Sequence, residues 1–326
     1  MMTIMRAVAL VAACLMSGQV LSNQAVAENY PNKPVRIIVP FPAGGVTDLA
    51  GRMIAQKLSE KLGQQFYIEN VGGAGGNLGM AQVARAPGDG YTVLLSSSSI
   101  TVNPSLYNKM PFDVEKDLIP VTKAGGSPNS WLVNPNFPAK SMTDMIDLFK
   151  KAPGTYSVGS PGAGTTPSLS IEQLKHDLKV DFVTVPFAGG GPMTQSVLGG
   201  HVPIVCGAIG NSVALIKEGK LRALGITDKR RLETLPDIPT LDEMGIKGQE
   251  AETMTGVFVP AGTSREIVNL LQREISTIVK SADIKPKLLE MGVVPEGDSP
   301  ESFTAYVKAD IAKWKRVIEQ ANIPKI

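Results

Sequence analysis

The chain has 326 residues, of which 32 are lysine or arginine and 30 are aspartate or glutamate, so its formal net charge at neutral pH is +2. A nearly neutral chain gives no electrostatic reason to expect nucleic-acid binding, and this length is sufficient for two domains of ordinary size. One of its two cysteines, Cys206, lies in the apolar run PIVCGA. It is expected to be a buried small residue rather than a nucleophile.

Residues 1–27 have the pattern of a secretory signal peptide. Arg6 is followed by the apolar run AVALVAACLM and by Ala-Val-Ala at residues 25–27. The apolar run is too short to span a bilayer, which disfavours the alternative of a transmembrane anchor. A further alternative is a lipoprotein with an acylated Cys14, although cleavage there would leave an unusually short leader. Removal of residues 1–27 would take Cys14 away, so no intrachain disulfide is expected in the mature chain.

Strand and helix patterns alternate from residue 35 onward, which predicts an α/β fold built from βα units around a parallel sheet. The β-branched run VRIIV is expected to be a strand that is covered on both faces. A turn rich in proline and glycine follows, and Thr47 is expected to cap a helix that stops at Gly63. Strands over residues 66–69 and 91–95, with a helix over 78–85 between them, would complete a βαβαβ unit.

The segment 100–138 is expected to be irregular, because Asn-Pro and Met-Pro pairs interrupt any long element. Two short apolar runs around residues 125–128 are expected to carry the chain between domains. A second α/β domain is predicted over residues 128–251, with strands over 155–158, 182–186, 202–206 and 221–227 and helices over 141–151, 168–178, 193–198 and 212–218. A strand over 255–262 and helices over 264–280 and 299–320 would return to the first domain, which therefore comprises residues 28–127 and 252–326.

Glycine-rich turns follow the predicted strands in both domains. In open α/β sheets ligands bind at the carboxyl ends of the strands, so the cleft between the domains is the expected pocket. Free amides and the helix dipole would favour an anion over Gly44 to Thr47. Asp48 lies beside this turn, and two roles remain open for it: stabilising the helix dipole or contacting the ligand.

The glycine turns do not complete a nucleotide-binding motif. Gly73-Ala74-Gly75 begins a dinucleotide fingerprint, but Leu78 stands where the third glycine is needed. Residues 159–164 have the spacing of a phosphate loop, but Thr165 stands where lysine is needed. No nucleotide cofactor is therefore expected.

Catalytic and metal-binding patterns are also missing from the sequence. No serine lies in a Gly-x-Ser-x-Gly elbow. His176 lies on a polar helix face and His201 lies in a turn, and neither forms a His-x-x-x-His pair. We therefore predict neither an enzyme nor a metal site, and the alternative of a secreted α/β enzyme lacks a recognisable nucleophile and base.

Eight sequence blocks, in order, resemble the Bug-type periplasmic receptors of tripartite tricarboxylate transporters. They are YPNKPVRIIVPFPAGGVTD, ENVGGAGGNLG, APGDGYTVLL, GAGTTPSLS, VPFAGGGP, LGGHVPIV, GKLRALGIT and LPDIPTLDEMG. The resemblance covers nearly the whole mature chain. It implies a type II periplasmic binding protein of two lobes with parallel or mixed sheets, which closes around an organic carboxylate held largely by main-chain amides.

The resemblance also implies the residues of the binding site. On the first lobe these are Phe41, Gly44, Gly45, Thr47 and Asp48, with Ser97, Ser98 and Ser99 beside them; on the second they are Gly164, Thr165, Thr166, Phe187, Ala188 and Gly189, with Gly207 and Gly210 in a further turn. The sequence departs from the family at Pro167-Ser168 and at Pro203, which concerns the ligand rather than the fold. Gly51 stands where alanine is usual and is expected to be a packing change.

The expected partners are a small carboxylate and the membrane permease subunits of a tripartite transporter, and the receptor itself is expected to be monomeric. A sensor kinase in place of the permease is the alternative partner. The proposed site residues are small and hydroxylic, so the sequence does not distinguish a short dicarboxylate from an amino acid or an aromatic acid.

Overall fold

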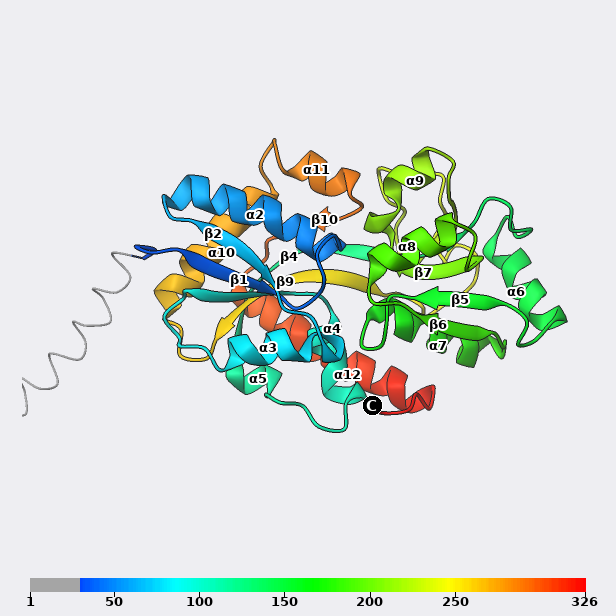
Figure 1. Ribbon diagram of the computed structural model, residues 1–326, viewed down its shortest axis with the longest axis horizontal. Coiled ribbons are helices and arrows are strands. Elements are labelled where there is room, and N and C mark those ends of the chain that lie inside the picture. Colours follow the sequence, from blue (N-terminus) through cyan, green and yellow to red (C-terminus); the bar gives the residue numbers. More distant parts are fainter. Residues whose placement is uncertain (1–29) are drawn as a thin grey trace, which may run out of the picture.

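The computed structural model describes residues 30–326. The predicted signal peptide and the Cys14 alternative lie outside these residues. Two lobes lie side by side along the long axis of the molecule (Figure 1). None of the helices within residues 30–326 combines the length and the apolar character that crossing a bilayer requires.

The first lobe is built on strands β1 (Val35–Val39), β2 (Phe66–Asn70), β3 (Thr92–Ser96), β9 (Glu252–Pro260) and β4 (Leu118–Val133), in the order β2-β1-β3-β9-β4. β1 is parallel to β2 and β3, whereas β9 is antiparallel to β3 and to β4. The sheet is therefore mixed. Its first three strands follow the βαβαβ order that the sequence predicts.

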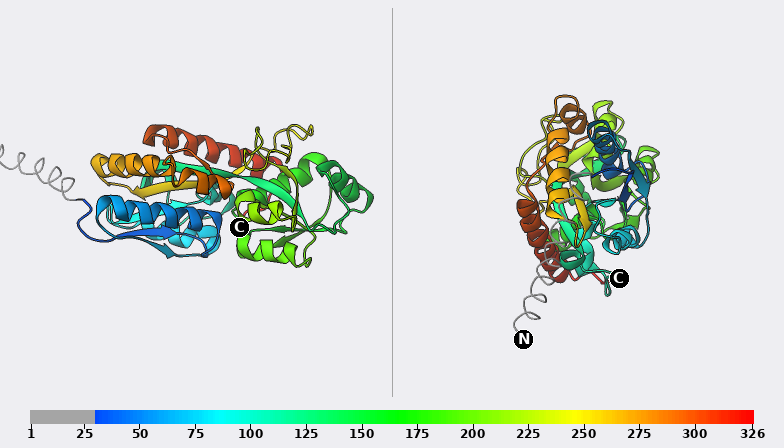
Figure 2. Two further views of the ribbon diagram at one scale, coloured as in Figure 1. Left: turned by 90° about the horizontal axis from the view of Figure 1, so that it is seen from above. Right: turned by 90° about the vertical axis from the view of Figure 1, so that its left-hand side faces the viewer.

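Helices cover both faces of this sheet (Figures 1 and 2). One face carries α2 (Val46–Leu62), α10 (Arg265–Val279) and α11 (Lys285–Glu290), and the other carries α3 (Asn77–Ala84), α4 (Ser99–Leu106), α5 (Val114–Asp117) and α12 (Pro300–Gln320). The buried apolar residues of these helices pack against the sheet in separate core clusters on its two faces. α12 also reaches the second lobe, where Trp314 packs in one cluster with Leu169.

The second lobe repeats this arrangement with β5 (Ser157–Ser160), β6 (Val183–Pro186), β7 (Ile204–Ala208) and β8 (Arg222–Ile226). Its strand order is β4-β7-β5-β6, with β8 also paired to β4. Helices α6 (Met142–Lys151) and α7 (Thr166–Leu178) pack on one face, and α8 (Gly190–Leu198) and α9 (Val213–Lys217) pack on the other. Ser141 and Asp144 form the capping box that starts α6, within the helix that the sequence predicts over residues 141–151.

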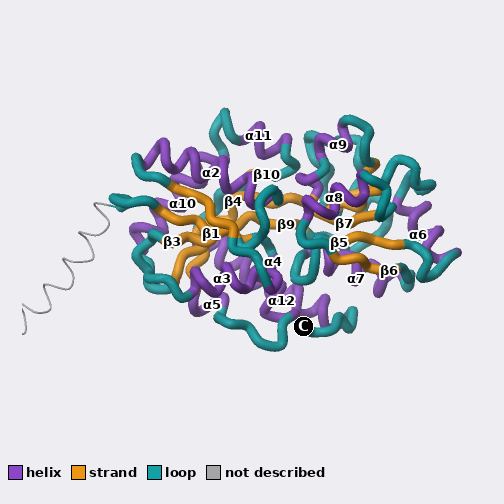
Figure 3. The backbone as a smooth tube through the Cα atoms, viewed as in Figure 1, coloured by secondary structure: helices purple, strands orange, loops and turns teal. Residues whose placement is uncertain are grey.

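The strand β4 belongs to both lobes. It pairs with β9 as far as Pro128 and with β7 from Asn129 onward, so the strands form one band along the molecule (Figure 3). The crossing near residues 125–128 was predicted, but the prediction of an irregular segment over 100–138 is wrong. Glycines inside β4 mark close backbone approach: a Cβ at Gly125 would lie 2.6 Å from the Val294 carbonyl oxygen of β10 (Val294–Pro295).

Two further expectations are corrected. Thr47 does not cap α2: the helix begins at Val46, and its N-cap is Gly45, which is extended with φ −75° and ψ 161°. Pro104 does not prevent a helix, because the short helix α4 is fixed by burial of Ile100, Val102 and Leu106. Tertiary packing overrides the local preference in this case.

Candidate functional site

A cleft of about 720 Å³, counting the space open to solvent at its mouth, lies between the two lobes. Its walls come from turns at the carboxyl ends of strands in both lobes, which is where α/β sheets bind ligands. It is lined by Phe41, Pro42, Ala43, Gly45, Val46, Thr47, Asp48, Ser97, Ser98, Pro161, Thr165, Thr166, Pro167, Ala188, Gly189, Gly190, Gly191, Pro192, Ala208, Asn211 and Thr253.

On the first lobe the cleft is met by the N-terminus of α2. The first helical hydrogen bond runs from the Leu49 amide to the Gly45 carbonyl oxygen at 3.0 Å. The amides of Val46, Thr47 and Asp48 precede this bond, and within the described residues no acceptor takes them. Three donors at the positive end of a 17-residue helix therefore stand at the cleft.

On the second lobe two more helices begin at the cleft. α7 is capped by Thr165, whose hydroxyl accepts from the Ser168 amide, and its first helical bond runs from Leu169 to Thr165. α8 begins after Gly189, whose φ of 120° favours glycine. Its first helical bond runs from Met193 to Gly189 at 3.4 Å. The amides that these bonds leave free are those of Thr166, Gly190 and Gly191.

Asp48 is buried, with 2% of its surface exposed. The four hydrogen bonds that its carboxylate accepts all come from residues of the first lobe. Oδ2 accepts from the Gly44 amide at 2.9 Å and from Arg52 Nε at 3.1 Å. Oδ1 accepts from Arg52 Nη2 at 3.1 Å and from Asn70 Nδ2 at 2.9 Å. Burial alone would raise the pKa of this carboxyl, but the hydrogen bonds outweigh burial and the pKa is lowered. Asp48 thus holds the turn that carries Gly44.

The hinge, residues 126–129 and 251–253, is linked to both lobes by hydroxyl groups at the base of the cleft. The carbonyl oxygen of Glu252 accepts from Ser98 Oγ of the first lobe at 3.0 Å and from Thr166 Oγ1 of the second lobe at 2.9 Å. Ser98 Oγ also accepts from the Met254 amide at 2.9 Å. The two lobes therefore share one acceptor at the hinge.

The structure brings ten of the sixteen expected site residues to the wall of this cleft. They are Phe41, Gly45, Thr47, Asp48, Ser97, Ser98, Thr165, Thr166, Ala188 and Gly189.

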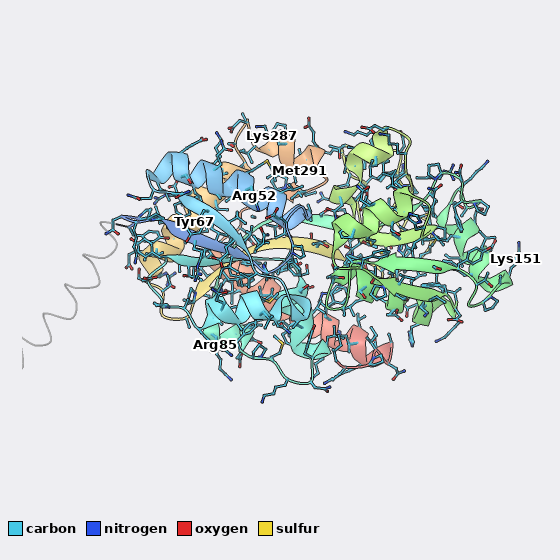
Figure 4. The ribbon with its side chains drawn as sticks, in the orientation of Figure 1. Arg52, Tyr67, Arg85, Lys151, Lys287 and Met291 are labelled. Carbon is cyan, nitrogen blue, oxygen red and sulfur yellow. The ribbon has the colours of Figure 1, made fainter. Side chains whose placement is uncertain are left out.

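The other six expected residues lie behind the wall or beside it: Gly44, Ser99, Gly164, Phe187, Gly207 and Gly210. Gly44 donates to Asp48, and Ser99 is fully buried. A Cβ on Gly164 would lie 2.5 Å from Asn103 Oδ1 of the first lobe, and one on Gly210 would clash with the Met291 carbonyl oxygen. These two glycines therefore lie where the lobes touch one another. Met291 is labelled at the end of α11 in Figure 4.

Sequence reasoning missed part of the second lobe's wall and part of the hinge. These residues are Pro161, Pro167, Gly190, Gly191, Pro192, Ala208, Asn211 and Thr253, together with Pro42, Ala43 and Val46 on the first lobe. The run GGGP, which comprises the N-cap and the first three residues of α8, was a detectable signal, because glycine and proline mark the start of a helix. Thr253 had no such signal, since only tertiary structure brings the hinge to the cleft.

The chemistry of the cleft is that of neutral dipoles. Among residues 30–326, no lysine, arginine or histidine lines it. Over the same residues, no group of three or more histidine, cysteine, aspartate or glutamate side chains is placed to hold a metal ion. Cys206 is fully buried, and burial raises the pKa of its thiol, so it is a core residue. The arrangement is suited to holding a small anion without a countercharge.

Comparisons with known proteins agree with this geometry. The family described as TctC, Tripartite tricarboxylate transporter family receptor, matches residues 50–323. Protein BugT of Bordetella pertussis is 33% identical over 301 residues, which are 91% of each chain. A solved structure described as R. palustris Rpa4515 with adipate is 34% identical, with a TM-score of 0.87, and covers 91% of this chain and 100% of that one. MatC from Rhodopseudomonas palustris with bound malate is 32% identical, with a TM-score of 0.83, and covers 89% and 100%.

Proposed function

Because the chain belongs to the receptor family of the tripartite tricarboxylate transporters, we propose that it is a periplasmic receptor that binds a small organic carboxylate between its lobes. In this proposal residues 1–27 direct export, and the loaded receptor delivers its ligand to the permease subunits of a tripartite transporter. The protein carries out no reaction on the ligand.

The observation that carries the proposal is the set of free amides at the starts of α2, α7 and α8. These helices come from both lobes, and their N-termini line one cleft. A carboxylate placed there accepts hydrogen bonds from dipoles that already point at it, so no buried countercharge is needed. The relatives that were solved with adipate and malate support an acid of that size.

We propose that the ten expected residues at the wall, together with the further residues of the wall, form the binding surface. The other six expected residues, Gly44, Ser99, Gly164, Phe187, Gly207 and Gly210, would support this surface from behind or beside it. In this arrangement Thr47 and Gly45 would face one end of the ligand, and Thr166 and Gly189 the other. We also propose that the lobes comprise residues 28–127 with 252–326, and residues 128–251. The separate core clusters on the two sides of the hinge support this division. Closure would add contacts that only the closed form offers.

Substitution of Gly45 tests the site. An added Cβ at Gly45 meets no atom within 4 Å and needs no positive φ, so the fold should accept alanine or valine. The side chain would occupy the space in front of the α2 amides. We expect G45A to weaken and G45V to abolish calorimetric binding of the acid that most raises the melting temperature in a screen of organic acids.

The control is Q56V, which places the same side chain on an exposed position of α2. Both valine variants should melt close to the parent temperature without ligand. Unchanged affinity in a folded G45V protein would reject this site. Turnover of the bound acid by the parent protein would indicate an enzyme instead of a receptor.

A further inference from the structure

We propose that the cleft selects acids that lack an ammonium group and discriminates against their 2-amino counterparts. This inference rests on the proposed function and narrows its ligand class. It concerns the state of Asp48 and the partners around it, which the family resemblance does not specify.

An ammonium group needs acceptors, and the cleft has no free charged one. Asp48 carries the only carboxylate that lines the cleft in residues 30–326. Each of its oxygens already accepts two hydrogen bonds, from Gly44, Asn70 and two nitrogens of Arg52. Since a carboxylate offers about four lone-pair sites, its accepting capacity is used up.

The remaining wall does not replace this acceptor. The carbonyl oxygen of Glu252 at its base is occupied by Ser98 and Thr166. The other polar side chains of the wall are neutral hydroxyls and the amide of Asn211. A cation would also face the positive ends of three helices, so its lost hydration would be poorly replaced.

Arg52 maintains this state from outside the cleft. Its side chain is half exposed, lies on α2 as labelled in Figure 4, and does not line the cleft. Its guanidinium contacts both carboxylate oxygens of Asp48. It therefore neutralises the one negative charge that would otherwise attract an ammonium and repel a carboxylate. Arg52 is a positioning residue for selectivity, because it acts through Asp48.

Ligands that differ only in one substituent test the proposal. Calorimetry first compares succinate, malate and aspartate, whose second carbon carries hydrogen, hydroxyl or ammonium. It then compares three pairs of acids without and with the ammonium group: glutarate with glutamate, adipate with 2-aminoadipate, and hexanoate with norleucine. Malate controls for the size of the substituent. We expect every ammonium-bearing acid to bind at least tenfold more weakly than its partner without nitrogen.

The outcomes separate this inference from the proposed function. An amino acid that binds as tightly as its partner, or more tightly, overturns the selectivity while the receptor function stands. If neither these acids nor any acid of the thermal screen binds, the proposed function fails and the inference fails with it. If another acid of the screen binds instead, the same comparison is made between that acid and its amino-substituted counterpart. Weaker binding of malate and aspartate by the same factor would attribute the effect to size and would also overturn the inference.

A variant tests the role of Arg52 separately. R52Q leaves the Asp48 charge without its guanidinium, so the ratio of affinities between the unsubstituted acid and its amino counterpart should fall at least threefold. R36Q is the matched control, because Arg36 pairs with Glu69 at 3.3 Å on the neighbouring strands and does not line the cleft. A folded R52Q protein with an unchanged ratio would overturn the role of Arg52, since loss of structure alone would weaken both acids together.

Discussion

At the scale of single residues, Asp48 shows that a carboxylate can line the cleft and still have no accepting capacity left for a ligand. Asp48 is the acidic residue that the sequence places beside the first turn, and its two possible roles could not be separated there. The structure shows that its four hydrogen bonds stay within the turn and the neighbouring Arg52 and Asn70. Arg52 follows Asp48 by four residues, which is the helical spacing for an ion pair, but the contact of Asn70 from β2 required the tertiary structure.

A second buried carboxyl, that of Asp310 on α12, has a raised pKa, whereas the pKa of Asp48 is lowered. Its Oδ2 lies 2.7 Å from Thr101 Oγ1 and 3.1 Å from Trp314 Nε1. The same Thr101 hydroxyl lies 2.7 Å from the Ser98 carbonyl oxygen, yet it has only one hydrogen to donate. Burial raises the pKa of Asp310, against the lowering effects of Thr101, Lys313 and Trp314. A protonated Asp310 could donate to Thr101 and satisfy both contacts.

We therefore predict that stability depends on the proton of Asp310. Its pKa is higher in the folded state, so the folded state keeps the proton where the unfolded chain has lost it. The free energy of unfolding then falls as the pH rises above the ordinary aspartate value of about 4. D310N, which mimics the neutral acid, should be more stable than the parent at pH 7.5 by about 1 kcal/mol, the scale of one mismatched buried hydrogen bond.

Thermal melts of the parent and D310N between pH 4 and pH 8 check this prediction. The two curves should converge toward pH 4, where the parent is also protonated. If D310N were less stable than the parent at every pH, the carboxylate would be the form that the fold requires.

At the scale of elements, local patterns predicted most strands and helices because each was bounded by its own signals. Ser141 with Asp144 begins α6, and Gly63 in the left-handed conformation ends α2, in both cases through local contacts. The long strand β4 was not predicted, because its glycines are explained by partners that are distant in sequence: β10 at Gly125 and Glu252 at Gly126. Similarly, the sequence predicted residues of the cleft wall that lie in glycine-rich turns. It missed Thr253, which belongs to the hinge.

A buried charge cluster lies close to the point where β4 crosses between the lobes. Lys123 of β4, 5% exposed, contacts Glu252 and also Glu296 at 2.8 Å, and its ammonium lies 4.5 Å from the centre of the Tyr306 ring. K123M would leave two neighbouring carboxylates without their shared cation, and Glu252 would keep the hydrogen bond from the Tyr306 hydroxyl at 2.9 Å. We expect a loss of about 3 kcal/mol at pH 7, the lower end of the cost for a buried pair, because both glutamates keep some solvent contact.

The pH dependence of this loss provides the check. Burial already raises the pKa of Glu296 in spite of Lys123, and removal of the lysine would raise it further. A raised pKa means that stability is lost as the pH rises, so denaturant melts of K123M should show a smaller deficit at pH 5 than at pH 8. K57M, which removes a partly exposed lysine paired with Glu60 and Asp283, should show a much smaller deficit. A deficit that is equal at both pH values would exclude the carboxylates as its cause.

At the scale of the whole molecule, the two lobes meet on both sides of the cleft. Gly164 of the second lobe approaches Asn103 of the first, and Gly210 approaches Val46 and Met291. The unbonded amides of both walls belong to residues that line the cleft. Small residues therefore let the backbones of the two lobes approach one another, while the free amides of both walls are left for a ligand. An anion that accepts from both walls would stabilise a closed arrangement of the lobes over a more open one.

Gly210 allows closure to be tested apart from the binding surface. It lies outside the cleft wall, and its φ is not positive, so valine causes no backbone strain there. An added Cβ would clash with the Met291 carbonyl oxygen and lie 2.8 Å from Val46 Cγ2, both in the opposite lobe. We expect G210V to keep its folded lobes but to oppose closure, so that affinity for the acid falls at least tenfold, whereas A214V, at an exposed position of α9, should bind normally. Small-angle scattering should show that the parent becomes more compact with ligand and that G210V does not. A G210V protein that compacts and binds like the parent would show that these contacts do not control closure.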